Sequence, residues 1–264
     1  MSDTVNTVLL GVVEGITEFL PVSSTGHLLI AEQWLGERSE LFNVAIQAGA
    51  ILAIVLIYWR RLLALLTRFD QPDNRDYLAK LVVAFLITGV GGFIATRKGF
   101  RLPESVVPVA IALIVGGIWI LLIEWYVARR PLAGQVTWNV AIWVGLLQIV
   151  AGVFPGTSRS AATIFAAMLA GLTLRPAATE FAFLVGIPTM FAATGYELLK
   201  TRGSAASEDM QALAVGFVVS GVVAFIAVKW LLRYVQTHRF TIFAWYRIVL
   251  GATLLGLVAR GVVR

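Results

Sequence analysis

One polar stretch near the start of the chain combines residue types that suit a phosphate or cation site. It interrupts an apolar region and reads Glu14-Gly-Ile-Thr-Glu-Phe-Leu-Pro-Val-Ser-Ser-Thr-Gly-His27. Glu14 and Glu18 are four residues apart, so on a helix they share one face, about 6 Å apart along the axis. A carboxylate pair of this kind could hold a divalent cation or move protons.

The second half of this stretch carries hydroxyl groups after a helix break. Pro21 cannot continue a helix, and Ser23 or Ser24 can cap a new one. The new helix would present hydroxyls and free N–H groups at its positive end, which is a natural phosphate site. His27 lies three residues after Ser24 on the same face, where it could act as a base for that hydroxyl. The alternative is that Ser23, Ser24 and Thr25 only cap the helix.

A second polar stretch, Pro155-Gly-Thr-Ser-Arg-Ser-Ala-Ala-Thr163, lies in another apolar region. Arg159 falls in the first turn of the helix that Thr157 or Ser158 would start, where a cation is unfavourable for the helix dipole. An anion shared between Arg159 and the N–H groups would explain it, because a guanidinium suits bidentate contact with phosphate. An ion pair with Glu14 or Glu18 is the alternative. The two interpretations are compatible, because the ion pair could form while the phosphate site is empty.

The composition is that of an integral membrane protein. Of the 264 residues 59% are hydrophobic and 14% charged, and the mean hydropathy is +0.85, whereas soluble domains are about 25% charged. The net charge of +6 is not clustered in a basic stripe, so we expect contact with anionic lipid and not with nucleic acid. Without cysteine, disulfides and thiolate metal sites are excluded. The first basic residue is Arg38, so we expect no cleavable signal peptide.

Apolar runs of two lengths organise the chain. The polar segment 67–76 contains Pro72 and is predicted to be a loop. Two short runs, 8–20 and 24–35, each reach about half the hydrocarbon core and meet at Pro21, which predicts a re-entrant hairpin. The run 145–171 is broken at its middle by Pro155-Gly156 and predicts a second hairpin. Long runs that could span a bilayer are 42–59, 78–96, 106–126, 180–199, 212–230 and 241–259.

The order of these runs repeats, which predicts an internal duplication. With an offset of 132 residues, the segment 88–95 matches 220–227. With an offset of 134 residues, the matched pairs are Gly11 and Gly145, Glu14 and Gln148, Pro21 and Pro155, and Ser24 and Ser158. The alternative is a chance likeness between apolar helices.

The fold class predicted is therefore an all-α polytopic membrane protein, one integral domain with two repeats of about 1–130 and 135–264. Each repeat holds one hairpin and three spans, so the second repeat is inverted and the hairpins enter from opposite faces to meet near the midplane. Loop arginines and lysines are slightly more numerous on the side of Arg60 and Arg61. The positive-inside rule makes that side cytoplasmic, so the termini and the first hairpin face outward.

The two polar stretches closely resemble the signature motifs of the bacterial undecaprenyl-pyrophosphate phosphatases, the bacitracin-resistance family. The resemblance covers essentially the whole chain, including its length, the order of the hairpins and the Phe-Ala-Trp-Tyr-Arg247 segment. It implies an inner-membrane enzyme that removes one phosphate from undecaprenyl pyrophosphate and so recycles the lipid carrier of peptidoglycan synthesis. The family fold is similar, with two re-entrant hairpins and a site that opens to the periplasm.

The resemblance also implies roles for particular residues. Glu14 and Glu18 match the acidic pair associated with a divalent cation, Mg²⁺ or Ca²⁺. Ser24 matches the proposed nucleophile, His27 its base, and Arg159 the phosphate-binding arginine; direct attack by water stays open. Further residues expected to bind substrate phosphate beside Arg159 are Ser23, Thr25, Ser158, Ser160 and Thr163. The partners expected are a polyprenyl pyrophosphate and membrane lipids, with a homodimer as one option for the oligomeric state.

Two other functions are alternatives that the sequence leaves open. Inverted repeats and broken helices are also typical of transporters, so a flippase for a phosphorylated lipid would fit the architecture. A flippase needs a phosphate site but no nucleophile beside a base. A structural membrane protein would need none of the ionisable groups that this chain places in apolar runs.

Overall fold

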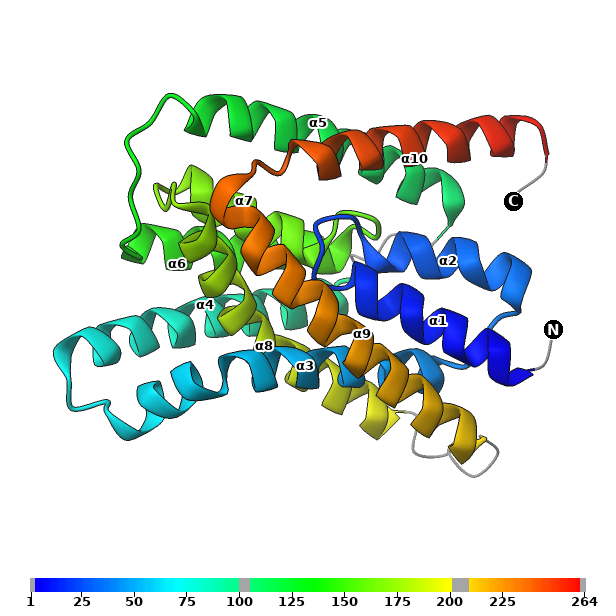
Figure 1. The fold of residues 1–264 in the computed structure, drawn as a ribbon, viewed down its shortest axis with the longest axis horizontal. Helices are drawn as coiled ribbons and strands as arrows, with labels where there is room; N and C mark the ends of the chain where they lie inside the picture. Colours follow the sequence, from blue (N-terminus) through cyan, green and yellow to red (C-terminus); the bar gives the residue numbers. More distant parts are fainter. Residues whose placement is uncertain (1–2, 100–104, 201–208, 262–264) are drawn as a thin grey trace.

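A computed structural model of the chain describes residues 3–99, 105–200 and 209–261, and within these ranges every regular element is a helix (Figure 1). The helices, in chain order, are α1 Asp3–Thr17, α2 Ser24–Leu35, α3 Glu40–Thr67, α4 Pro72–Arg97, α5 Val106–Val127, α6 Trp138–Val153, α7 Arg159–Leu169, α8 Arg175–Lys200, α9 Met210–Thr237 and α10 Thr241–Ala259.

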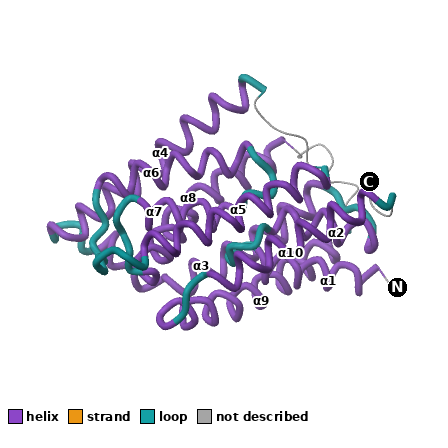
Figure 2. The backbone as a smooth tube through the Cα atoms, turned by 90° about the horizontal axis from the view of Figure 1, so that it is seen from above, coloured by secondary structure: helices purple, strands orange, loops and turns teal. Residues whose placement is uncertain are grey.

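Six of these helices are long and apolar enough to cross a membrane, namely α3, α4, α5, α8, α9 and α10. The predicted all-helical polytopic fold is therefore confirmed for the described part of the chain. The beginning of α1 and the end of α10 lie at the same end of the molecule (Figures 1 and 2), as an even number of crossings requires. The protein is a multi-pass membrane protein.

The predicted loop over 67–76 is wrong in its second half, because α4 begins at Pro72. A proline is well placed at the first position of a helix, where its missing N–H has no intrahelical partner to lose. The negative charge of Asp73 in the same turn is favourable at the positive end of the helix dipole. The preceding helix α3 likewise runs beyond the predicted span and ends at Thr67.

Two pairs of short helices form hairpins whose loops meet in the middle of the molecule. We call α1 and α2 with residues 18–23 the first hairpin, and α6 and α7 with residues 154–158 the second hairpin. The helices of each pair pack on one another, and Figure 1 shows the two hairpins coming from opposite ends. This arrangement agrees with the predicted pair of re-entrant hairpins.

Matched close contacts hold each hairpin against a span from the other half of the chain. A Cβ on Gly11 of α1 would lie 3.1 Å from the carbonyl oxygen of Gly216 in α9. A Cβ on Gly145 of α6 would lie 2.8 Å from the carbonyl oxygen of Ala84 in α4. The two contacts are related by the offsets found in the sequence. The duplication itself stays a prediction, and these contacts are what it requires.

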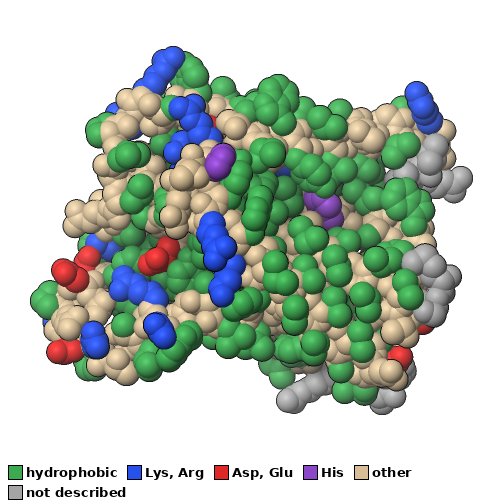
Figure 3. Space-filling model, in the orientation of Figure 1, with side chains coloured by type: hydrophobic (Ala, Val, Ile, Leu, Met, Phe, Trp, Pro, Cys, Tyr) green, Lys and Arg blue, Asp and Glu red, His purple; other side chains and the backbone are tan. Residues whose placement is uncertain are grey.

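The surface separates charged from apolar side chains. On the face shown in Figure 3, lysine, arginine, aspartate and glutamate side chains gather mainly over the end where α3 turns into α4, while hydrophobic side chains cover much of the middle. An apolar belt of this kind suits contact with lipid tails, because no water is present there to solvate charges.

Candidate active site

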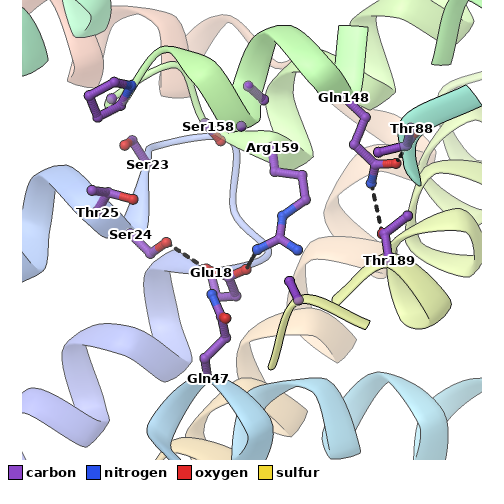
Figure 4. Close-up of a pocket in the computed structure, with 15 residues that line it drawn as sticks. Glu18, Ser23, Ser24, Thr25, Gln47, Thr88, Gln148, Ser158, Arg159 and Thr189 are labelled. Atoms are coloured by element: carbon purple, nitrogen blue, oxygen red, sulfur yellow. Dashed lines mark hydrogen bonds and ion pairs between the residues drawn. The ribbon is translucent and has the colours of Figure 1, made fainter. Parts of the chain in front are cut away.

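A cavity of about 330 Å³ lies where the loops of the two hairpins meet. Both hairpins contribute to it, together with spans α3, α4 and α8 (Figure 4). Its only charged lining residues among those described are Glu18 and Arg159. The full polar lining is Glu18, Ser23, Ser24, Thr25, Gln47, Thr88, Gln148, Ser158, Arg159 and Thr189.

The first hairpin presents the N-terminus of α2 to this cavity. Ser23 is the N-cap, and its hydroxyl accepts a hydrogen bond from the N–H of Gly26 at 3.4 Å. Ser23 adopts a positive φ of 77°, a left-handed conformation that is costly for a residue with a Cβ. Ser24 follows as the first residue of α2, and its hydroxyl donates to Oε2 of Glu18 at 2.5 Å.

The second hairpin repeats this geometry with a different charge. The structural counterpart of Ser158 is Ser23, the other N-cap, and not Ser24, which the offset of 134 residues had matched with it. Ser158 has a φ of 69° and caps α7 by accepting from the N–H of Ala161 at 3.3 Å. Arg159 is the first residue of α7, and its Nη2 donates to Oε1 of Glu18 at 2.8 Å. The cap is therefore Ser158 rather than Thr157, and Arg159 forms the ion pair that the sequence left as an alternative.

Glu18 joins the two hairpins through its two carboxylate oxygens, one held by Ser24 and the other by Arg159 (Figure 4). The residue is 6% exposed. Because Ser24 already donates its proton toward Glu18, the carboxylate is placed to accept that proton if the serine oxygen attacks an electrophile. Because Arg159 and two helix N-termini border the same cavity, an anion such as phosphate would be stabilised there.

Three neutral side chains from different helices form the opposite wall of the cavity. The amide oxygen of Gln148 accepts from the Thr88 hydroxyl at 2.8 Å, and its amide nitrogen donates to the Thr189 hydroxyl at 3.0 Å (Figure 4). In the sequence, Gln148 stands out only as the counterpart of Glu14, and neither threonine is predicted to belong to the site. Neutral polar residues are common in spans, so the sequence carried no signal beyond that offset.

Two residues predicted to act do not line this cavity. Glu14 is a buried residue of α1, 2% exposed, and it is not part of the cavity lining. His27 has Nδ1 at 2.7 Å from the carbonyl oxygen of Ser23 and Nε2 at 2.7 Å from the hydroxyl of Tyr246. Since the Ser24 hydroxyl is bonded to Glu18, the geometry does not support His27 as its base, and that role stays a prediction.

The predicted phosphate-binding hydroxyls also divide into two groups. Ser23, Thr25 and Ser158 line the cavity. Ser160 instead donates to the carbonyl oxygen of Leu20 at 2.9 Å, which ties the second hairpin to the first. Thr163 donates to the carbonyl oxygen of Arg159 at 2.8 Å and lies outside the cavity.

The donor set suits a cation that is shared with a phosphate ligand, not one caged by protein alone. Among the described residues, no group of three or more histidine or acidic side chains could hold a metal. Glu18 offers one carboxylate to the cavity, and Gln47 points toward it (Figure 4). Mg²⁺ commonly takes one or two protein carboxylates and completes its coordination with waters and substrate phosphates. The residues present therefore fit such a cation.

Comparison with known proteins gives one consistent result. The family described as "Bacitracin resistance protein BacA" matches residues 7–253. A relative from Rhizobium etli named "Undecaprenyl-diphosphatase" is 65% identical over 263 residues, which is 99% of each chain. A relative of the same name from Xanthomonas oryzae pv. oryzae is 58% identical over 257 residues, or 97% of each chain.

Proposed function

The chain belongs to the Bacitracin resistance protein BacA family, and we propose that it hydrolyses undecaprenyl pyrophosphate to undecaprenyl phosphate and inorganic phosphate. Its relatives are named for this activity. They match the chain over almost their whole length. The product would return a lipid carrier to peptidoglycan synthesis.

The observation that carries the proposal is the line of contacts from Ser24 through Glu18 to Arg159. It joins the Ser24 hydroxyl and the Arg159 guanidinium, each at the N-terminus of a helix, through the carboxylate of Glu18 in the loop of the first hairpin, and all three border one cavity. Phosphoryl transfer needs mainly positioning and charge neutralisation. These groups supply both, and the hydroxyl bonded to a carboxylate supplies a candidate nucleophile that a simple flippase would not require.

In the first step, the Ser24 oxygen attacks the terminal phosphorus and its proton passes to Glu18. The bond from that phosphorus to the bridging oxygen breaks, and undecaprenyl phosphate leaves with the electron pair. Arg159 exchanges its contact with Glu18 for the phosphoryl oxygens, where it meets the developing negative charge. This exchange also frees the Glu18 carboxylate to take the proton.

In the second step, water attacks the phosphorus of the phosphoserine, the bond to the serine oxygen breaks, and inorganic phosphate leaves. Glu18 returns its proton to the serine oxygen, and the departing phosphate keeps both hydrogens of the attacking water and leaves as dihydrogen phosphate. The simpler alternative is direct attack by water, with Glu18 as its base and Ser24 as a binding group. Both routes use the same cavity and the same guanidinium.

A divalent cation, Mg²⁺ or Ca²⁺, would be held at Glu18 together with the pyrophosphate oxygens. When bound, it would neutralise part of the pyrophosphate charge. Glu14 is buried and does not line the cavity. It would therefore not be a direct ligand of the cation and would influence it only through the charge of Glu18.

The cellular setting is a further part of the proposal, and the distribution of charge supports it. We place the protein in the bacterial inner membrane, with the cavity opening to the periplasmic side. Support comes from the positive-inside rule, which puts the arginines near the turn from α3 to α4, such as Arg60 and Arg61, and those after α5 on the cytoplasmic side.

The proposal is tested by phosphate release from undecaprenyl pyrophosphate, using purified protein in detergent with Mg²⁺, with Ca²⁺ and with a chelator. Metal-dependent release by the wild type is expected, with Ser24→Ala lowering kcat by at least about 10²-fold if serine is the nucleophile. Ser105→Ala is the matched control and should keep wild-type activity, because Ser105 is the N-cap residue of α5, makes no side-chain capping hydrogen bond and does not line the cavity. No release by folded wild-type protein with any metal would contradict the proposal and favour the flippase.

A further inference from the structure

Arg247 is the largest side chain that the described structure buries completely, and it lies outside the cavity. It belongs to α10 and has no exposed surface. None of the ion pairs found among the described residues includes it. A buried cation without a paired anion is costly. The contacts of the Arg247 guanidinium indicate what it does.

The guanidinium donates to four backbone carbonyl oxygens. Nη1 donates to Pro21 in the loop of the first hairpin at 3.3 Å, and Nη2 donates to Gly156 in the loop of the second hairpin at 3.0 Å. Nη2 also donates to Ala112 at 3.1 Å and Nε to Leu113 at 3.4 Å, both in α5. One side chain therefore connects both loops to each other and to a membrane span.

The two loop carbonyls lie at equivalent places in the two hairpins. Pro21 precedes Ser23 by two residues, and Gly156 precedes Ser158 by two residues. Ser23 and Ser158 are the only described residues other than glycine with a positive φ. Such conformations persist where the surroundings hold them. The hydrogen bonds that Arg247 donates to Pro21 and Gly156 restrain both loops at once.

The fold reserves space for this arginine. A Cβ on Gly116 of α5 would lie 2.2 Å from Nη2 of Arg247, so any larger residue there would displace the guanidinium. The planar guanidinium offers five donors in a fixed fork, whereas a lysine ammonium is a single point charge. A lysine could keep the charge of Arg247 but could not reach both loops with the same geometry.

We propose that Arg247 is a positioning residue for the phosphatase reaction, an inference that rests on the proposed function. Through the Pro21 and Gly156 carbonyls it sets the separation of the two loops, so that Ser24 and Arg159 face the same phosphoryl group. Its unpaired charge, one residue behind the cavity wall that Gly156 forms, also adds to the attraction of the cavity for phosphate.

The first test compares Arg247→Lys with Arg175→Lys. Arg175 is also largely buried, but it pairs with Glu124 and does not line the cavity. Arg247→Lys should lower kcat by about 10- to 100-fold per folded molecule, because small displacements of reacting groups have effects of that size. Arg175→Lys should lower thermal stability with kcat within about twofold of wild type. If Arg247→Lys loses only stability and keeps wild-type kcat and KM, the proposal is wrong.

A second pair of variants keeps the arginine and so remains informative if Arg247→Lys does not fold. Gly116→Ala pushes on the guanidinium, whereas Gly117→Ala presses on the carbonyl oxygen of Ala244, 2.7 Å from the added Cβ. Both disturb the packing of α5 on α10, so their stability losses should be similar. Only Gly116→Ala should lower kcat selectively, and equal kinetic effects from the two variants would overturn the proposal.

A third measurement separates this inference from the proposed function. The shift in Tm that inorganic phosphate causes in the wild type should shrink in Arg247→Met and persist in Arg175→Lys, whether or not the protein hydrolyses a prenyl pyrophosphate. A wild type that releases no phosphate but shows this pattern would contradict the proposed function alone. An unchanged phosphate-dependent shift in Arg247→Met would contradict the electrostatic part of the inference.

Discussion

The first and second hairpins share a backbone plan and differ in charge. Each ends a short helix before a proline-containing loop and begins the next helix after a serine cap with a positive φ, 77° at Ser23 and 69° at Ser158. The first hairpin brings Glu18 to the cavity and the second brings Arg159. The similar loops aim two helix N-termini at one cavity, and the opposite charges make each hairpin incomplete without the other.

A second difference lies in the first helices of the hairpins. Glu14 in α1 is buried away from the cavity, whereas its counterpart Gln148 in α6 lines the cavity and is bonded to two threonines. Among the described residues, the cavity lining therefore contains a single carboxylate, that of Glu18. This suits a polyanionic substrate, because a second carboxylate in the lining would repel it.

Removing the charge of the second hairpin should have the largest effect. Arg159→Ala is expected to lower kcat by about 10³-fold or more, because arginines that meet transferred phosphoryl groups contribute effects of that size. Steady-state phosphate release checks this, with Arg159→Lys as the companion variant that keeps the charge but not the fork. Near wild-type kcat in Arg159→Ala would show that the second hairpin does not supply a catalytic charge.

Making the second hairpin resemble the first should have an intermediate effect. Gln148→Glu places a second carboxylate on the cavity and is expected to raise KM for the pyrophosphate by about tenfold, since one charge repulsion of about 1.4 kcal/mol gives that factor. Gln148→Met removes the amide without adding charge and serves as the control. If both variants raise KM equally, the loss is one of hydrogen bonding and the electrostatic comparison fails.

A smaller effect is expected from the histidine that only the first hairpin carries. His27→Asn should change kcat by less than about fivefold, because the ring is bonded to Ser23 and Tyr246 and does not line the cavity. The pH dependence of kcat should also be unchanged. A loss as large as that of Ser24→Ala, with Tyr246→Phe unaffected, would restore His27 as the base that the sequence predicted.

The smallest effect concerns the shared serine caps. Ser158→Ala and Ser158→Gly both remove the hydroxyl that caps α7, but only glycine relieves the left-handed backbone. Ser158→Gly should therefore be more stable than Ser158→Ala by about 1 kcal/mol, measured as Tm in detergent. The same ranking is expected at Ser23. A different ranking at the two sites would break the equivalence of the loops.

Much of this arrangement was predictable because it depends on neighbours in the sequence. The spans follow from apolar length, and a helix break near Pro21 follows from its missing N–H, although α1 already ends at Thr17. That a serine after Pro21 caps α2 follows from local hydrogen bonding, and the structure selects Ser23 from the two candidates, Ser23 and Ser24. The sequence also brought Glu18, Ser24 and Arg159 forward as candidates, because ionisable and hydroxyl groups are unusual in apolar runs.

The remainder depends on which side chains meet across the fold. Local pattern could not show that Glu18 faces the cavity while Glu14 is buried, because the two are one turn apart. The convergence of Thr88, Gln148 and Thr189 joins three helices far apart in the chain. Each is an ordinary polar residue in a span when considered alone. Only tertiary packing gives them a shared role.

The central claim is that the two hairpins act as one site, and a double-variant cycle tests it most directly. Ser24→Ala, Arg159→Lys and the double variant would be compared by kcat/KM for phosphate release. Residues that act as a unit are strongly non-additive, so the double variant should lose little more than the worse single variant. Independent losses that multiply in the double variant, or full activity in Ser24→Ala, would contradict the claim.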